Sequence, residues 1–206
     1  MWLRADRQTA GHGRRGRQWD SPTGNLMVSY LGPLQVGVAE AALLGFAVGV
    51  ALAEWAGKVV PTGCAVGLKW PNDLMLNGAK AGGLLLEADP QAGWLALGLG
   101  INLATAPHGL AYPTASLAGV GTDPVPDPDA ALAALAPVCA HWAGILAQEG
   151  FDPIRTAWTQ RAHGLGLEAR VDRGGEQIPG QVSGLDPSGA LVLLTPTGQR
   201  TIGAGD

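Results

Sequence analysis

Apolar and polar positions along the chain follow two different periods, and this predicts both helices and strands in one fold. Apolar residues recur at helical spacing, with Leu44, Val48, Leu52 and Trp55 as the clearest series. Helices are predicted over 40–57, 127–148 and 152–162. Short apolar runs bounded by Gly, Pro and Asn predict strands over 26–31, 66–70, 74–76, 79–87 and 94–103. The pattern indicates an α+β fold, a mixed or antiparallel sheet packed against helices.

The pattern of the sequence changes after the segment 164–166. Short strands separated by Gly- and Pro-containing turns are predicted over 167–172, 176–185, 190–195 and 199–202. Such a series is typical of a small all-β module, and we expect a barrel. The length of 206 residues fits one large and one small domain. We therefore expect a domain over 1–164 and a second over 165–206.

One hairpin is specific enough to predict a register. Asn77-Gly78 between two apolar runs is typical of a two-residue hairpin turn. This turn would pair Met75 with Lys80 and Asp73 with Gly82. Asp73 and Lys80 should then point to the same side of the sheet.

Charge is sparse and unevenly placed. Only 15% of residues are charged, 47% are hydrophobic and the net charge is −4, which argues against disorder and against a nucleic-acid binder. Five arginines nevertheless fall in the first 17 residues: Arg4, Arg7, Arg14, Arg15 and Arg17. A local positive cluster on an acidic protein suggests a site for a small anion.

Other classes of protein receive little support. The two cysteines and four histidines show no metal-ligand spacing, and two cysteines fit a reduced, cytoplasmic protein. The apolar run 41–53 is shorter than the roughly 20 residues of a membrane span, so we expect no membrane segment. Neither a Ser/His/Asp arrangement nor a Walker phosphate loop is present.

Three segments carry candidate chemistry. The loop 7–17 combines glycines, which let backbone N–H groups approach an anion, with arginines that grip carboxylate or phosphate. A solvated loop or an RNA-binding arm is the alternative, although no Phe or Tyr is interleaved for base stacking. Lys69-Trp-Pro-Asn-Asp73 and Lys80 place charged side chains in an apolar β-meander, where their burial is costly unless they bind a ligand or each other. A surface hairpin with an Asp73–Lys80 ion pair is the alternative. Gly98-Leu-Gly-Ile-Asn102 lacks the strand-to-helix context of a dinucleotide fingerprint, but Asn102 could contact a nucleobase edge.

Taken together, these segments resemble biotin protein ligase in order and spacing. The carrying residues are Ala10-Gly-His-Gly-Arg-Arg-Gly-Arg17-Gln-Trp19, Lys69-Trp-Pro-Asn-Asp-Leu74 with Lys80-Ala-Gly-Gly83, and Gly98-Leu-Gly-Ile-Asn102. The resemblance implies a class II synthetase-like catalytic domain with a C-terminal SH3-like barrel. It also implies activation of biotin by ATP and Mg²⁺ to biotinyl-5′-AMP, followed by transfer to a lysine of a biotin carboxyl carrier domain.

The resemblance also implies roles for individual residues. Arg14 and Lys80 would be catalytic. Biotin would be bound by Gln8, Gly11, His12, Gly13, Arg14, Lys80, Gly83, Leu85 and Gly98. ATP would be bound by Arg15, Arg17, Lys69, Asn72, Asp73 and Asn102, with Asp73 also a candidate ligand for Mg²⁺.

The chain departs from the family pattern in three places. A Ser-Thr-Asn segment that usually precedes the arginine loop is expected to be missing, His12 stands where Arg is common, and the barrel is expected to end early. A DNA-binding role is not expected, and a homodimer is left open. A non-catalytic biotin- or carrier-binding protein and a lipoate-type ligase are the alternatives to a monofunctional biotin ligase.

Overall fold

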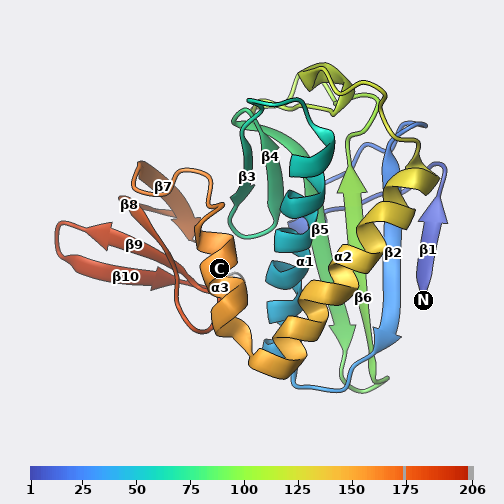
Figure 1. Ribbon diagram of the computed structural model, residues 1–206. Helices are drawn as coiled ribbons and strands as arrows, with labels where there is room; N and C mark the ends of the chain where they lie inside the picture. The colour runs from blue at the N-terminus through green and yellow to red at the C-terminus, as the bar shows by residue number, and fades with distance from the viewer. Residues whose placement is uncertain (174, 204–206) are drawn as a thin grey trace.

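The computed structural model describes residues 1–173 and 175–203, and its main layers are shown in Figure 1. A six-stranded antiparallel sheet has the order β1-β2-β6-β5-β4-β3, and a four-stranded antiparallel sheet has the order β10-β9-β8-β7. The large sheet contains β1 (Trp2–Ala5), β2 (Leu26–Pro33), β3 (Val66–Lys69), β4 (Asp73–Leu76), β5 (Ala79–Asp89) and β6 (Trp94–Ile101). The helices are α1 (Val38–Val59), α2 (Pro128–Glu149) and α3 (Phe151–Thr159), with short 3-10 turns at Arg14–Gly16 and Ala118–Val120. The small sheet contains β7 (Glu168–Arg173), β8 (Glu176–Leu185), β9 (Leu191–Thr195) and β10 (Gly198–Ile202).

The predicted α+β class and each predicted helix and strand are confirmed, with ends that shift by a few residues. The antiparallel alternative is the correct one for the large sheet. Strand β1 was not predicted, because four residues that include a charged one have no readable period. It pairs with β2, and Arg4 fastens it to the start of α2 through Asp129, with 2.5 Å between Nε and Oδ1.

Strand alternation separates a helix-covered face of the large sheet from the opposite face. Leu97, Leu99 and Ile101 of β6 are buried, whereas Gly98 and Gly100 between them point to the other side. α1 lies against β3, β4 and β5, and α2 lies along α1 (Figure 1). The apolar residues therefore form a core on the helix side and leave glycines on the other.

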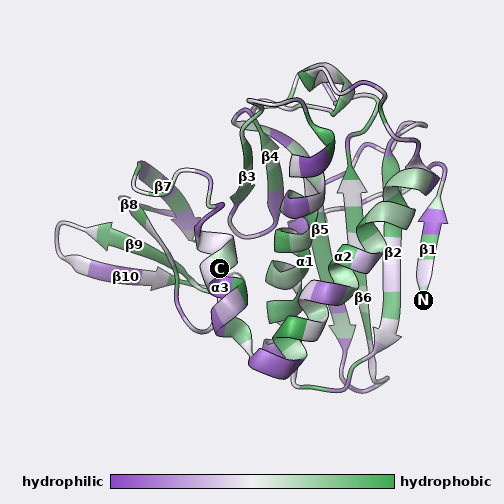
Figure 2. Cartoon of the chain, in the orientation of Figure 1, coloured by the Kyte–Doolittle hydropathy of each residue, from purple (hydrophilic) through white to green (hydrophobic). Residues whose placement is uncertain are grey.

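Helix α1 is the central core helix. Its residues from Phe46 to Ala53 are all buried, and Figure 2 shows hydrophobic residues along it and on the strands behind it. By length and composition alone, α1 and α2 could each cross a membrane, a test that core helices of soluble proteins also pass. The burial of α1 under the sheet accounts for its apolar sequence.

The predicted hairpin forms, but half of its register was wrong. Asn77 and Gly78 have φ of 48° and 79°, as the two-residue turn requires, and Met75 pairs with Lys80. Asp73 pairs with Gly83 rather than Gly82, because the register shifts between Leu74 and Met75. This bulge leaves Asp73 and Lys80 on the same side, as expected.

The segment that leads into the C-terminal module is joined to the large sheet by backbone hydrogen bonds, and the module itself is joined to the core by apolar packing. Leu68 N–H donates to the Arg161 carbonyl and His163 N–H to the Leu68 carbonyl, each at 2.8 Å, so the segment 161–163 covers the β3 edge. Ile178 and Leu193 of the small sheet belong to the same buried cluster as α1. The division at residue 164 stays a prediction, since the hydrophobic core is continuous across it.

Candidate active site

A cavity of about 360 Å³ lies on the face of the large sheet opposite the helices. Cross-strand pairs form its floor, with Gly83 opposite Gly100 and Leu85 opposite Gly98. A Cβ on Gly98 would meet only Leu85, at 3.7–3.9 Å, so the space above this row is open. The glycines thus provide room for a ligand directly against the backbone of the sheet.

The arginine-glycine loop forms a small hairpin over this floor. Trp19 N–H donates to the Gly11 carbonyl at 2.9 Å and Gly13 N–H donates to the Arg17 carbonyl at 2.7 Å. At its tip Arg15 has a φ of 58°, a left-handed conformation that is uncommon outside glycine. The loop is therefore held in a defined shape rather than as a free solvated arm.

Trp19 at the end of this hairpin packs against the floor. A Cβ on Gly100 would lie 2.5 Å from Trp19 Cε2, so the indole rests directly on the glycine backbone. It also lies near Gly83, where a Cβ would be 3.6 Å from Trp19 Cζ3. Only a residue without a side chain at 100 permits this approach.

Asp73 of β4 and Lys80 of β5 form an ion pair in the cavity. Lys80 Nζ lies 2.7 Å from Asp73 Oδ1, and each side chain is 20% exposed. The same ammonium lies 5.7 Å from the Trp19 ring centroid and 5.8 Å from that of Tyr112. Partial burial between two aromatic rings strengthens the interaction of Lys80 with any anion that enters.

Positive charge gathers around this pair. Arg14, Arg17 and Lys69 line the cavity together with Lys80. Burial, followed by repulsion from Arg15 and Arg17, lowers the pKa of the Arg14 guanidinium, while Asp73 opposes the shift. The cavity therefore carries an excess of cations that a polyanionic ligand would relieve.

Two predicted polar residues use their side chains to fix the protein itself. The Asn72 amide donates to the Leu84 carbonyl, and Leu84 N–H donates back to the Asn72 carbonyl at 2.9 Å. The Asn102 amide donates to the Ala115 carbonyl at 3.0 Å. Asn102 thereby anchors the loop that follows β6 with one of its two amide N–H groups.

A second cavity of about 240 Å³ adjoins the first across Trp19, Lys80 and Tyr112. Its wall comes from the loop after β6, including His108 and Leu110, and Asn102 lies at its base. Lys80 N–H donates to the Pro113 carbonyl at 2.9 Å, which ties this loop to the backbone of Lys80. Lys80 thus stands at the junction of two spaces.

The structure brings most of the predicted site residues together. The first cavity is lined by Gln8, His12, Gly13, Arg14, Arg17, Lys69, Asn72, Asp73, Lys80, Gly83, Leu85 and Gly98. Gly11 instead packs at the base of the hairpin, where a Cβ would meet Gln8 Oε1 at 2.7 Å, and Asn102 borders the second cavity. Arg15 is at the tip of the loop. Their assigned roles stay predictions.

Sequence reasoning gave no role in the site to twelve further residues that line the first cavity. Trp19, Ser29, Glu87 and Tyr112 are four of them. Alternation on β5 from Leu85 could have placed Glu87, and Trp19 follows directly on the arginine loop. Tyr112 and Ser29 carried no signal, because their contact with the site depends on how a loop and a neighbouring strand pack.

Comparison with known proteins identifies the family. The model of the Biotin/lipoate A/B protein ligase family matches residues 4–102, and that of the Biotin protein ligase C terminal domain matches residues 165–206. The chain is 39% identical to the biotin--[acetyl-CoA-carboxylase] ligase of Paracoccus denitrificans, covering 100% of this chain and 88% of the relative. The chain belongs to the biotin protein ligase family.

Further relatives agree. A Mycobacterium tuberculosis biotin--[acetyl-CoA-carboxylase] ligase is 32% identical, over 99% of this chain and 77% of its own length. The biotin protein ligase from Aquifex aeolicus, solved in complex with biotin and ATP, superposes with a TM-score of 0.81 at 28% identity. That likeness covers 98% of this chain and 84% of the other. The resemblance inferred from the three sequence segments is confirmed.

Proposed function

We propose that this chain is a biotin--[acetyl-CoA-carboxylase] ligase, which activates biotin with ATP and transfers it to a lysine of a carrier domain. The observation that supports this function best is the ion pair between Asp73 and Lys80, 2.7 Å apart. It lies in a cavity that cationic side chains line and that the arginine loop covers, in a chain that belongs to the family. The Paracoccus relative bears the name of this activity, and the Aquifex structure was solved with both small substrates.

The first step joins two anions and needs their repulsion cancelled. An oxygen of the biotin carboxylate attacks the α-phosphorus of ATP, the bond to the bridging oxygen breaks, and pyrophosphate leaves with the electron pair. Lys80 is the cation best placed to hold both reacting groups, because it stands between the two cavities. Arg14, Arg17 and Lys69 add the charge that stabilises the crowded phosphates.

The residues that line the two cavities suggest where each substrate binds. The glycine floor of the first cavity suits the biotin body, with its carboxylate directed to Lys80, and the cations that line the same cavity, Arg14, Arg17 and Lys69, suit the phosphates of ATP. The neighbouring cavity suits the nucleoside, with Tyr112 and Trp19 as aromatic walls. Asp73 holds the ammonium of Lys80 at the boundary, which limits its conformational freedom before the substrates arrive.

The second step needs no enzyme nucleophile. The neutral amine of the acceptor lysine attacks the carbonyl carbon of the adenylate, the bond from that carbon to the phosphate oxygen breaks, and AMP leaves with the electron pair. The nitrogen loses a proton to solvent as the amide forms. The enzyme has to hold the adenylate and exclude water until the acceptor docks. The arginine hairpin, pinned to the floor by Trp19, is the segment that covers it.

Magnesium is proposed to enter on ATP. Within the described residues, no group of three or more His, Cys, Asp or Glu side chains could hold a metal. Asp73 is the carboxylate next to the cations, and it is paired with Lys80. A single carboxylate suits a Mg²⁺ whose other ligands are phosphate oxygens and water. We also propose the cytoplasm, where the free cysteines Cys64 and Cys139 would stay reduced.

The deciding experiment mixes the purified chain with biotin, Mg-ATP and a biotin carboxyl carrier domain. We expect pyrophosphate release that depends on biotin, and biotin on the carrier lysine by mass spectrometry. A carrier with that lysine changed to arginine should stay unmodified. Binding of biotin without pyrophosphate release would favour a non-catalytic binding protein, and turnover with lipoate in place of biotin would favour a lipoate-type ligase.

A further inference from the structure

Trp70 connects the cavity wall to the C-terminal module. It lies in the segment Lys69–Asp73, which ends β3, begins β4 and contributes Lys69, Asn72 and Asp73 to the cavity. Its indole Nε1–H donates to the carbonyl of Gly189, between β8 and β9, at 3.1 Å. The ring itself packs, partly buried, against the main core. One side chain therefore touches both the cavity and the small sheet.

The turn that accepts this hydrogen bond is rigid. Asp186 Oδ1 accepts from Ser188 N–H at 2.8 Å, from the Ser188 hydroxyl at 2.7 Å and from Ala190 N–H at 2.9 Å. Gly189 N–H also donates to the Asp186 carbonyl at 3.0 Å. Burial alone would raise the pKa of the Asp186 carboxyl, but the hydrogen bonds from Ser188 and Ala190 and the charge of Arg155 outweigh it and lower the pKa.

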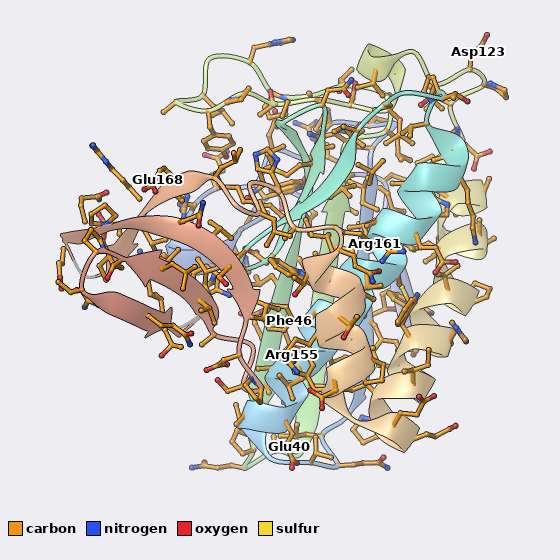
Figure 3. The ribbon with its side chains drawn as sticks, turned by 60° about the vertical axis from the view of Figure 1, so that its left-hand side comes forward. Glu40, Phe46, Asp123, Arg155, Arg161 and Glu168 are labelled. Atoms are coloured by element: carbon orange, nitrogen blue, oxygen red, sulfur yellow. The ribbon has the colours of Figure 1, made fainter. Side chains whose placement is uncertain are left out.

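Gly189 packs directly against Phe46 of α1, and a residue with a side chain could not come as close. Its φ is +82°, and a Cβ there would lie 2.6 Å from Phe46 Cε2. Phe46 packs edge-on against Phe151 and Trp158 of α3, with ring centroids 5.7 and 6.1 Å away. Figure 3 shows Phe46 on α1 where it faces α3 and the small sheet. The position of the Gly189 carbonyl is thus set by packing between the two parts of the chain.

We propose that Trp70 is a positioning residue for adenylate formation. The Gly189 carbonyl fixes the position of the Trp70 indole, and the indole in turn fixes the position of the segment Lys69–Asp73 relative to Lys80. The C-terminal turn thereby influences the phosphate side of the cavity without touching a substrate. The floor of the biotin pocket consists of paired residues of β5 and β6, and the hydrogen bond from Trp70 to Gly189 joins neither of these strands. This inference rests on the proposed function.

The test compares two tryptophans that each donate one indole hydrogen bond. Trp70→Phe removes the bond to Gly189 and keeps an aromatic ring. Trp142→Phe removes the matched bond from α2 to Glu54 Oε2, 2.9 Å long, and Trp142 is absent from both cavity walls described above. Loss of one positioning hydrogen bond should raise the KM for Mg-ATP about tenfold in Trp70→Phe. The KM for biotin should change less than twofold, and Trp142→Phe should leave both constants near wild type.

A second variant disturbs the same contact from the other side. Gly189→Ala should push the turn away from Phe46 and raise the KM for Mg-ATP in the same way, with the Trp70 side chain intact. The double variant should be no worse than the more affected single one, because both remove one interaction. If Gly189→Ala does not fold, Ser188→Ala loosens the turn more gently, and it should raise the KM for Mg-ATP by a smaller factor.

The outcomes separate this inference from the proposed function. If wild type releases no pyrophosphate with biotin, the proposed function fails. If wild type is active, Trp70→Phe lowers only the melting temperature, and its constants equal those of Trp142→Phe, then Trp70 is structural and the inference is overturned. Additive effects in the double variant, or an equal rise in the KM for biotin, would overturn it as well.

Discussion

Gly100 is expected to control how the arginine hairpin closes. The glycine is not among those with positive φ, so alanine fits its backbone conformation in β6. The added Cβ, however, would lie 2.5–2.6 Å from three atoms of the Trp19 indole, where ordinary contacts begin near 3.4 Å. The indole must therefore move by about 0.9 Å, the difference between 3.4 and 2.5 Å. The hairpin carrying Trp19 must move with it.

The cost of this displacement sets the expected effect. Inserting a methyl group into a packed contact typically costs about 1–3 kcal/mol. Because the floor is part of a sheet and Trp19 belongs to a surface hairpin, we expect the hairpin to move and the floor to stay in place. The closed hairpin should then be disfavoured by about 10–100-fold, and the KM for biotin should rise by a similar factor.

The arginines of the hairpin provide a direct assay. Trypsin should cleave Gly100→Ala faster than wild type at Arg14, Arg15 or Arg17, with the fragments identified by mass spectrometry. Gly98→Ala is the matched control for cleavage, since its Cβ would meet only ordinary contacts at 3.7–3.9 Å. Equal cleavage rates for Gly100→Ala and wild type, with an unchanged KM for biotin, would refute the packing argument.

Three further predictions follow from other parts of the molecule. Lys80→Ala should lower biotin-dependent pyrophosphate release by about 100-fold or more, and an unchanged rate would remove Lys80 from the reacting centre. Burial raises the pKa of the Cys139 thiol to about 12, so its thiolate forms only as pH approaches that value. At pH 8 a thiol reagent should modify at most Cys64 in the native protein and both cysteines after unfolding, and rapid native modification of Cys139 would contradict its burial. Leu52→Ala, at a fully buried position of α1, should reduce the free energy of unfolding by about 2–5 kcal/mol in urea titrations, and a loss below 1 kcal/mol would show that the core closes around the gap.

The sequence by itself determined every helix and strand except β1, and most of the candidate site. Helix α1 and the hairpin β4–β5 are readable because apolar periodicity and Asn77-Gly78 act over a few residues. The family resemblance named Gly83, Leu85 and Gly98 as site residues, and the pairing of β5 with β6 places them on one face of the sheet. Local rules predicted the hairpin turn correctly but missed the bulge between Leu74 and Met75 in the same hairpin.

Tertiary structure decided the parts that depend on distant partners. The packing of Trp19 on Gly100 and the approach of Tyr112 to Lys80 each join segments that lie far apart in the sequence. The hydrogen bond from Trp70 to Gly189 spans 119 residues. No periodicity encodes such contacts, because they arise only when the sheet, the loops and the C-terminal module pack together and their shapes exclude other arrangements.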